Sequence, residues 1–284
     1  MWRVPAASGE PTPANGGATA QLVLVIDHDR LWTNHDRLWL IGTGPTPAFG
    51  AALACDIERT TGRRVTDVIV TRAAPELSMG NVAFANARLW ALPDVIDAMR
   101  ERCGQCMARS KARLGEAGES LSDEAIRVPG RPIGAAHRAE GRIGPFDWLA
   151  VERAPGEQVL VLKLKASAVV VAQGLLWAGD VPDLRDTRSD AMLASLRALQ
   201  AFAGGARVLG EQGGVAGLGG IAGHIAYIEA LRSAVRGHLA RGDVQGAAGS
   251  EVDLPAFATL PGYALRHPLN VQRVWRELEP DVFR

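Results

Sequence analysis

Short apolar runs alternate with longer amphipathic segments along most of the chain. Apolar runs of about four to eight residues bounded by turn residues predict buried strands, and longer segments with apolar residues three or four positions apart predict helices. We predict strands at residues 22–26, 38–41, 65–70, 148–152, 158–164, 168–172, 175–179 and 206–209. We predict helices at residues 48–60, 93–114, 189–202, 221–240 and 270–278. Strands within and helices outside indicate a layered α/β sandwich.

The amino-terminal segment differs from the rest of the chain. Residues 1–20 are rich in Pro, Gly, Ala and Ser and contain no apolar stretch typical of a signal peptide or membrane helix. We therefore predict a flexible tail at residues 1–20, followed by a single domain at residues 21–284 with a helical extension at its carboxyl end. A cytoplasmic chain and a periplasmic chain that has lost a leader both remain open.

The composition narrows the class of partner. The 284 residues are 47% hydrophobic with a mean hydropathy of +0.02, which predicts a soluble protein with a sizeable core. The 31 basic residues balance 31 acidic ones, which argues against nucleic acid or an anionic membrane as a partner. Three cysteines do not make a disulfide framework.

The segment 67–81, DVIVTRAAPELSMGN, is the most informative part of the sequence. Its apolar run ends at Thr71, and Gly80 and Asn81 close the segment. It resembles the loop of metallo-β-lactamase-fold proteins that carries the zinc-binding motif His-x-His-x-Asp-His. The residues in that frame are Arg72, Ala74, Glu76 and Leu77.

Three later segments, which follow in the order of the same family, extend the resemblance over most of the chain. Residues 176–186 resemble the strand end whose aspartate bridges two zinc ions, here Asp180. Residues 155–158 and 207–213 stand where the family has Gly-His-Thr and Pro-Gly-His-Gly, and both lack the histidine. The resemblance implies an α/β fold, the four-layer αββα sandwich of the metallo-β-lactamases.

Four segments resemble one branch of this superfamily, the quinoprotein relay system zinc metallohydrolases. They are residues 103–106, 227–231, 267–271 and 277–279. That branch is associated with dehydrogenase systems that depend on pyrroloquinoline quinone. The resemblance implies a partner in such a quinoprotein system.

The substituted loop is unsuited to zinc. Zinc needs imidazole, thiolate or carboxylate donors, and neither arginine nor alanine nor leucine can donate a lone pair to it. Arg72 would also bring a permanent positive charge towards a dication. We therefore expect no zinc cofactor and no ordinary two-zinc hydrolysis.

The six histidines do not replace the lost ligands. A direct repeat of His-Asp-Arg-Leu-Trp begins at His28 and again at His35, and local duplication explains it better than metal binding. The remaining histidines have no ligand spacing, so we interpret them as surface or helix-packing residues. They are His137, His224, His238 and His267.

The implied fold would gather a residual pocket of charged residues, namely Arg72, Glu76, Glu157, Asp180 and Glu211. Our preferred hypothesis is that the Arg72 guanidinium replaces zinc as the positive centre and pairs with Asp180 or Glu76, because an unpaired buried carboxylate is costly. The same ion pair could equally close a site without function. A third interpretation places Mg²⁺ or Ca²⁺ among the carboxylates, although Arg72 argues against a cation.

We predict a binding or accessory protein for an unknown small molecule or protein, without hydrolase activity. The first alternative is hydrolysis of an ester, amide or thioester with Glu76 or Asp180 as general base; Ser78 is interpreted as a turn residue. The second is a thiol redox partner, since Cys103 and Cys106 share a helix face and nearby arginines would favour the thiolate. Haem attachment is not supported, because Met107 stands where a c-type attachment motif needs histidine.

Overall fold

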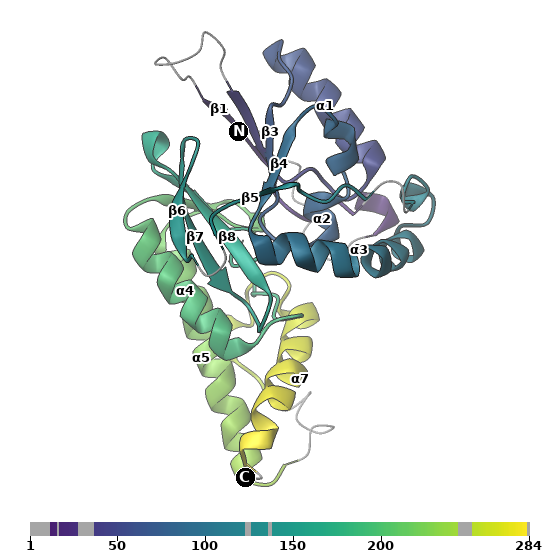
Figure 1. Cartoon of the computed structure of the whole chain (residues 1–284). Coiled ribbons are helices and arrows are strands. Elements are labelled where there is room, and N and C mark those ends of the chain that lie inside the picture. Colours follow the sequence, from purple (N-terminus) through teal and green to yellow (C-terminus); the bar gives the residue numbers. More distant parts are fainter. Residues whose placement is uncertain are drawn as a thin grey trace. The chain divides into compact units, whose positions relative to one another are not determined.

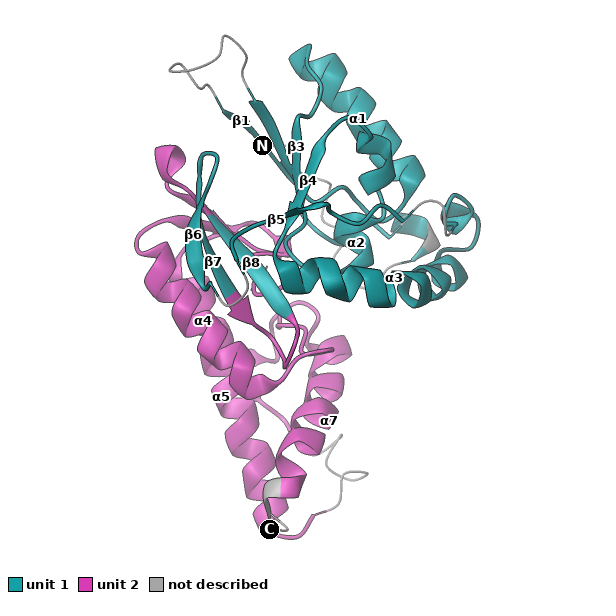
Figure 2. Ribbon diagram, in the orientation of Figure 1, with its two compact units in different colours: residues 1–150, 158–162 teal, residues 151–157, 163–284 magenta. Residues whose placement is uncertain are grey.

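The chain forms two compact units in the computed structural model, which describes residues 12–15, 17–27, 37–122, 126–135, 138–243 and 252–282. Unit 1 comprises residues 1–150 and 158–162, and unit 2 comprises residues 151–157 and 163–284 (Figure 2). The prediction of a single domain at 21–284 stays a prediction. Within the described ranges, no helix is long and apolar enough to cross a membrane.

Unit 1 contains a five-stranded sheet in which spatial order follows chain order (Figure 1). Its strands are β1 (Val23–Asp27), β2 (Arg37–Ile41), β3 (Asp67–Ile69), β4 (Arg88–Ala91) and β5 (Arg131–Pro132). β1 and β2 pair antiparallel, and the remaining strands add in parallel. The parallel strands place their amino ends at one edge of the sheet and their carboxyl ends at the other.

The connections between these strands are helical. They contain α1 (Pro47–Thr61), α2 (Pro75–Ser78), α3 (Pro93–Leu114) and the 3-10 turns η2 (Asn81–Phe84) and η3 (Gly115–Gly118), while η1 (Pro13–Asn15) precedes the sheet. The side chain of Thr46 caps α1 by accepting a hydrogen bond from the Phe49 backbone N–H at 3.1 Å. Gly62 ends the same helix with φ 68°, a conformation that glycine adopts without strain.

Unit 1 also holds a β-hairpin. β6 (Glu140–Ile143) pairs antiparallel with β7 (Phe146–Glu152), and Gly144 turns the chain with φ 50°. β7 and β8 (Gln158–Leu164) each begin in one unit and end in the other. The Leu160 backbone N–H of β8 donates to the Thr71 carbonyl at 2.9 Å, which ties this short insertion to unit 1.

Unit 2 combines short strands with three long helices. The strands are β9 (Val169–Val171), β10 (Trp177–Ala178), β11 (Arg207–Leu209), β12 (Gln212–Gly213) and β13 (Val215–Ala216). β9 and β11 pair in parallel, β11 and β13 antiparallel, and β10 and β12 in parallel. The helices are α4 (Ser189–Ala203), α5 (Leu218–Ala240) and α7 (Tyr263–Val282), with 3-10 turns η5 (Lys165–Ser167) and η6 (Pro255–Phe257). α5 packs against both α4 and α7 (Figure 1).

The predicted elements are present, with shifted ends and several omissions. The carboxyl-terminal helix begins at Tyr263 and not at residue 270, because Pro268 is accommodated inside it. Two side chains anchor the turns before that proline: Arg266 pairs with Asp180, and His267 contacts Tyr227. β4, β5, β6, β12 and β13 were not predicted, because such short strands depend on pairing with distant neighbours.

The predicted flexible tail is only partly described. Residues 1–11 and 16 lie outside the described residues, as do residues 28–36, which include the first copy of the repeat and His35; the last three residues of the second copy, 37–39, begin β2. Thr19 and Ala20, at the end of the predicted tail, are buried where the chain leads into β1.

Candidate functional site

The loop after β3 contains an internal ion pair. Arg72 follows the carboxyl end of β3, and Glu76 lies in the first turn of α2. An Arg72 guanidinium N–H donates to the Glu76 carboxylate, and the two side chains are 16% and 20% exposed. Glu76 is one of the two partners predicted for Arg72. Neither residue is a lone charge in this loop.

The glycine and asparagine that close the loop have packing roles. A Cβ on Gly80 would lie 2.2 Å from the Thr43 carbonyl oxygen, so only glycine fits this approach. The Thr43 hydroxyl donates to Asn81 Oδ1 at 2.8 Å, and the Asn81 amide donates to the Arg127 carbonyl at 2.9 Å. Ser78, interpreted from the sequence as a turn residue, is the last residue of α2, and its hydroxyl donates to the Ala74 carbonyl at 2.8 Å. The loop frame can therefore persist without a metal.

Asp180 lies in unit 2, two residues after the end of β10, in a buried ion pair. Arg266 Nη1 lies 2.6 Å from Asp180 Oδ2, and the two side chains are 5% and 11% exposed. The same guanidinium donates to the Val181 carbonyl at 3.1 Å and to Gln212 Oε1 at 3.0 Å. A Cβ on Gly262 would lie 2.5 Å from Asp180 Oδ1, so glycine is needed beside this carboxylate. A guanidinium thus neutralises the aspartate that the resemblance assigned to zinc.

Sequence reasoning missed Arg266. It is 86 residues from Asp180 in the chain, and its position before His267-Pro268 gives no local sign of such a pairing. Only the folding of α7 against the turn after β10 brings the two groups together.

The other two predicted carboxylates also lie in unit 2. Glu211 is 3% exposed, and its Oε2 accepts a hydrogen bond from the Gly174 backbone N–H at 2.7 Å. Glu157 lies in the turn between β7 and β8, where its backbone N–H donates to the Ala154 carbonyl at 2.8 Å. Because Arg72 and Glu76 belong to unit 1, the convergence of all five residues on one pocket stays a prediction.

Two histidines predicted to pack in helices do so. His224 is buried and stacks on Trp177, with 6.3 Å between ring centroids, and its Nε2 accepts from the Trp177 backbone N–H at 3.1 Å. Burial and the positive charge of Arg266 lower the pKa of His224 to about 4. His267 is buried between the Tyr227 hydroxyl, 2.9 Å from Nδ1, and the Val252 carbonyl, 2.8 Å from Nε2.

Of the two other single histidines, the structure describes only His238. His238 is 2.9 Å from the carboxylate of Asp243. His137 lies outside the described residues.

The surroundings of Cys103 do not favour the thiolate that the nearby arginines suggested. Cys103 is 7% exposed in α3, and burial, together with the neighbouring Cys106, raises its pKa to about 11. Cys106 is half-buried and accepts a hydrogen bond from Arg109 at 3.4 Å. The expectation was wrong for Cys103 because desolvation outweighs the arginines on the exposed side of the helix.

The donor set does not fit the zinc that the resemblance implies. Among the described residues, no group of three or more His, Cys, Asp or Glu side chains is placed to hold a metal ion. Asp180 instead faces the guanidinium of Arg266. A zinc ion beside that guanidinium would be repelled, so no step of a reaction is assigned to a metal here.

Three solved structures resemble the chain over most of its length. A metallo-β-lactamase from Erythrobacter litoralis, solved with β-mercaptoethanol in its active site, superposes with a TM-score of 0.58 at 16% identity, covering 74% of this chain and 85% of that one. One from Hirschia baltica gives 0.58 at 14% identity, with the same coverage of 74% and 85%. The mono-zinc form of FIM-1 from Pseudomonas aeruginosa gives 0.53 at 12% identity, covering 73% and 90%.

The fold is that of the metallo-β-lactamases. The predicted α/β fold class is thereby confirmed. No protein-family model matches the chain, and no curated protein matches its sequence. At these identities the metallo-β-lactamase likeness concerns the fold alone, and function has to be argued from the residues.

Proposed function

We propose that this chain is a metal-free protein of the metallo-β-lactamase fold that binds a small molecule or a protein partner and does not hydrolyse it. The observation that carries the proposal is the buried ion pair between Arg266 and Asp180, at 2.6 Å with side chains 5% and 11% exposed. A buried carboxylate requires a positive partner, and here a side chain supplies it.

The first loop supports the same proposal. Glu76 is paired with Arg72, so the carboxylate nearest the substituted motif already has a cationic partner within its own loop. The guanidinium that replaces a metal beside Asp180 is thus Arg266, and Arg72 plays the matching role beside Glu76. We infer that these two guanidinium groups neutralise the carboxylates in place of the zinc ions of the hydrolases of this fold.

A place in a quinoprotein system is part of this proposal and rests on the sequence resemblance. The residues that carry it towards the carboxyl end are structural in unit 2. The Asn270 amide donates to the Tyr227 hydroxyl at 3.1 Å and to the Pro182 carbonyl at 2.8 Å. Packing within unit 2 therefore accounts for Tyr227 and Asn270 without a quinoprotein partner. The proposed place in a quinoprotein system must be tested by measuring direct binding of the protein to quinoprotein dehydrogenases.

Neither alternative function gains support from the contacts. A carboxylate-based hydrolase needs Glu76 or Asp180 as general base, and each is engaged by an arginine. A thiol redox partner needs a reactive Cys103, which is buried with a raised pKa.

The proposal is tested by metal analysis of tag-free protein by inductively coupled plasma mass spectrometry, followed by a zinc titration against a chromophoric chelator. We expect less than about 0.1 equivalent of any transition metal and no competition for zinc. The matched variant is Asp180→Ala. Stoichiometric zinc in the wild type that disappears in this variant would overturn the proposal, as would turnover of an ester, amide or thioester that requires Asp180.

A further inference from the structure

Charged residues open four neighbouring strands of the unit 1 sheet. Arg37, Asp67, Arg88 and Arg131 are the first residues of β2, β3, β4 and β5. These strands run parallel, so the four residues lie at the amino edge of the sheet. The loop with Arg72 follows the carboxyl end of β3, at the opposite edge.

Asp67 is the single carboxylate among these four residues, and its side chain is fully buried. Its oxygens accept hydrogen bonds from Arg37 at 2.9 Å, Arg88 at 2.8 Å, Trp90 Nε1 at 2.8 Å and Thr66 at 2.9 Å. Burial acts to raise the pKa of Asp67, but these hydrogen bonds and the charge of Arg37 outweigh it and lower the pKa. At neutral pH Asp67 is thus an anion whose single charge is shared between two arginines.

Two further guanidinium groups at this edge have no carboxylate partner among the residues that the structure describes. Arg127 donates to the backbone carbonyls of Phe84, at 2.5 Å, and Ala87, at 3.2 Å, and these acceptors are neutral. Arg131 lies over the ring of Trp90 at 5.4 Å from its centroid, and it forms no ion pair with any residue in the described ranges.

Within this group, four guanidinium groups therefore face one carboxylate. They are Arg37, Arg88, Arg127 and Arg131, with Asp67 as the carboxylate. Asp27, opposite Arg37 in the β1–β2 pair, is a second carboxylate at this edge, so the excess among these residues is two positive charges.

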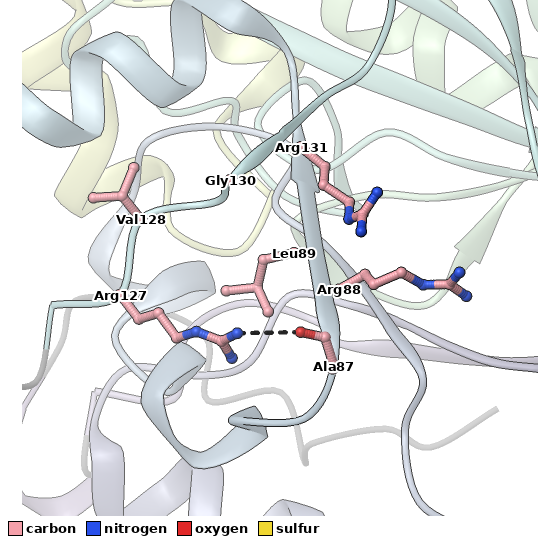
Figure 3. Close-up of a pocket in the computed structure, with 7 residues that line it drawn as sticks. All are labelled: Ala87, Arg88, Leu89, Arg127, Val128, Gly130 and Arg131. Carbon is pink, nitrogen blue, oxygen red and sulfur yellow. Dashed lines mark hydrogen bonds between the residues drawn. The ribbon is translucent and has the colours of Figure 1, made fainter.

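Three of these arginines line an open pocket of about 480 Å³ (Figure 3). We call it the arginine pocket, and it is lined by Ala87, Arg88, Leu89, Arg127, Val128, Gly130 and Arg131. Figure 3 shows the Arg127 side chain directed to the Ala87 carbonyl, to which it donates a hydrogen bond. The side chains of Arg88 and Arg131 extend away from that carbonyl. The Arg88 side chain is 42% exposed even though it pairs with Asp67.

We propose that the arginine pocket binds the phosphate group of a small phosphorylated molecule or free phosphate. Guanidinium groups bind phosphate through paired N–H donors, and a dianion suits a cluster with an excess of two positive charges. The volume leaves room for a small organic group beside the phosphate. This site is independent of the proposed function, which rests on the Asp180–Arg266 pair in unit 2 and on the Arg72 loop at the opposite edge of the unit 1 sheet.

The test is a titration of ¹⁵N-labelled full-length protein with potassium phosphate, against potassium chloride at equal ionic strength. The reporter is the Trp90 indole N–H signal, which bonds to Asp67 within the cluster and is assigned by its loss in Trp90→Phe. We expect a saturable shift with phosphate only. A second titration with glycerol 3-phosphate separates the sources: tighter binding than phosphate indicates an organic phosphate, and equal binding indicates the free ion.

Two pairs of variants separate an effect at the arginine pocket from effects of net charge and of side-chain size. Arg131→Gln should weaken phosphate binding about tenfold or more, because it removes a charge-assisted hydrogen bond to the phosphate. Arg113→Gln removes an exposed arginine from the end of α3 and should change nothing. A Cβ on Gly130 would meet no atom within 4 Å, so Gly130→Glu can place a carboxylate in the pocket, with Gly130→Gln as its neutral match.

We expect Gly130→Glu to weaken phosphate binding more than Gly130→Gln, because the new carboxylate competes for the arginines. Absence of saturation in the wild type would overturn the proposal. Equal weakening by Arg113→Gln and Arg131→Gln would also overturn it, because the effect would then come from net charge and not from this pocket.

Discussion

Replacement of Arg266 by methionine tests whether the buried ion pair holds unit 2 together. Two opposite charges about 4 Å apart attract by about 4 kcal/mol at an effective dielectric constant of about 20. The variant also removes the hydrogen bonds to Val181 and Gln212, worth about 1 kcal/mol each, while the methionine side chain recovers part of the packing. We therefore expect Arg266→Met to lower the free energy of unfolding by about 3 to 5 kcal/mol.

The matched control is Arg197→Met, which breaks an exposed ion pair in the same unit. Arg197 lies 2.6 Å from Glu229, the same distance as in the buried pair, but the side chains are 60% and 50% exposed. The expected loss is below about 1 kcal/mol, because solvent screens an exposed pair. The two variants thus differ in burial and not in bond length.

Urea unfolding, followed by circular dichroism and tryptophan fluorescence, gives both free energies and shows whether the two probes report one transition. Adding Asp180→Asn to Arg266→Met should restore part of the lost stability, because the cost in the single variant is an unpaired buried carboxylate. The reasoning is refuted if Arg266→Met costs no more than Arg197→Met, or if the second substitution destabilises the protein further.

Three further predictions concern titration and thiol access. Folding lowers the pKa of Asp67, so the ionised carboxylate stabilises the folded state at pH values above the unfolded-state pKa of about 3.9. This contribution is lost as the pH falls through the folded-state pKa. The stability of Asp67→Asn should therefore depend less on pH in that acidic window. Folding lowers the pKa of His224 to about 4, so between about pH 6.5 and 4 this histidine is protonated in the unfolded chain but neutral in the folded protein. The free energy of unfolding should therefore fall as the pH drops through this range, and His224→Gln should reduce that dependence on pH. With Ellman's reagent at pH 8, exposed Cys55 and half-buried Cys106 should react quickly and Cys103 only on unfolding; three equally fast thiols would contradict its burial.

The sequence predicted those elements whose signals are local. α1 and α3 begin with proline at the first helical position, and an apolar run marks β8. The start of α7 was misplaced because a proline normally marks a boundary, and long-range anchors hold the turns before Pro268. Local sequence patterns therefore predict the elements of this fold, except where contacts between residues distant in the chain set the end of an element.

The candidate site was predictable in its substitutions but not in its pairings. The sequence identified Arg72, Glu76 and Asp180 as residues to examine, and the i,i+4 spacing of Arg72 and Glu76 is a sign of pairing. Arg266 reaches Asp180 only through tertiary packing, so spacing could not reveal it. The charged residues that open successive strands, such as Asp67 and Arg88, were visible in the sequence, but their alignment required the strand order.

The path of the chain through β7 and β8 decides how the protein can be dissected. Residues 151–157 belong to unit 2 and residues 158–162 to unit 1, so the backbone changes unit three times. A fragment that stops at Ala150 would lack Leu160 and leave the Thr71 carbonyl without that hydrogen bond, next to the substituted loop. Neither unit corresponds to a continuous stretch of the gene, so expressing the units as separate chains would require joining residues 1–150 to 158–162 and residues 151–157 to 163–284 through new linkers, and truncation alone would not do it.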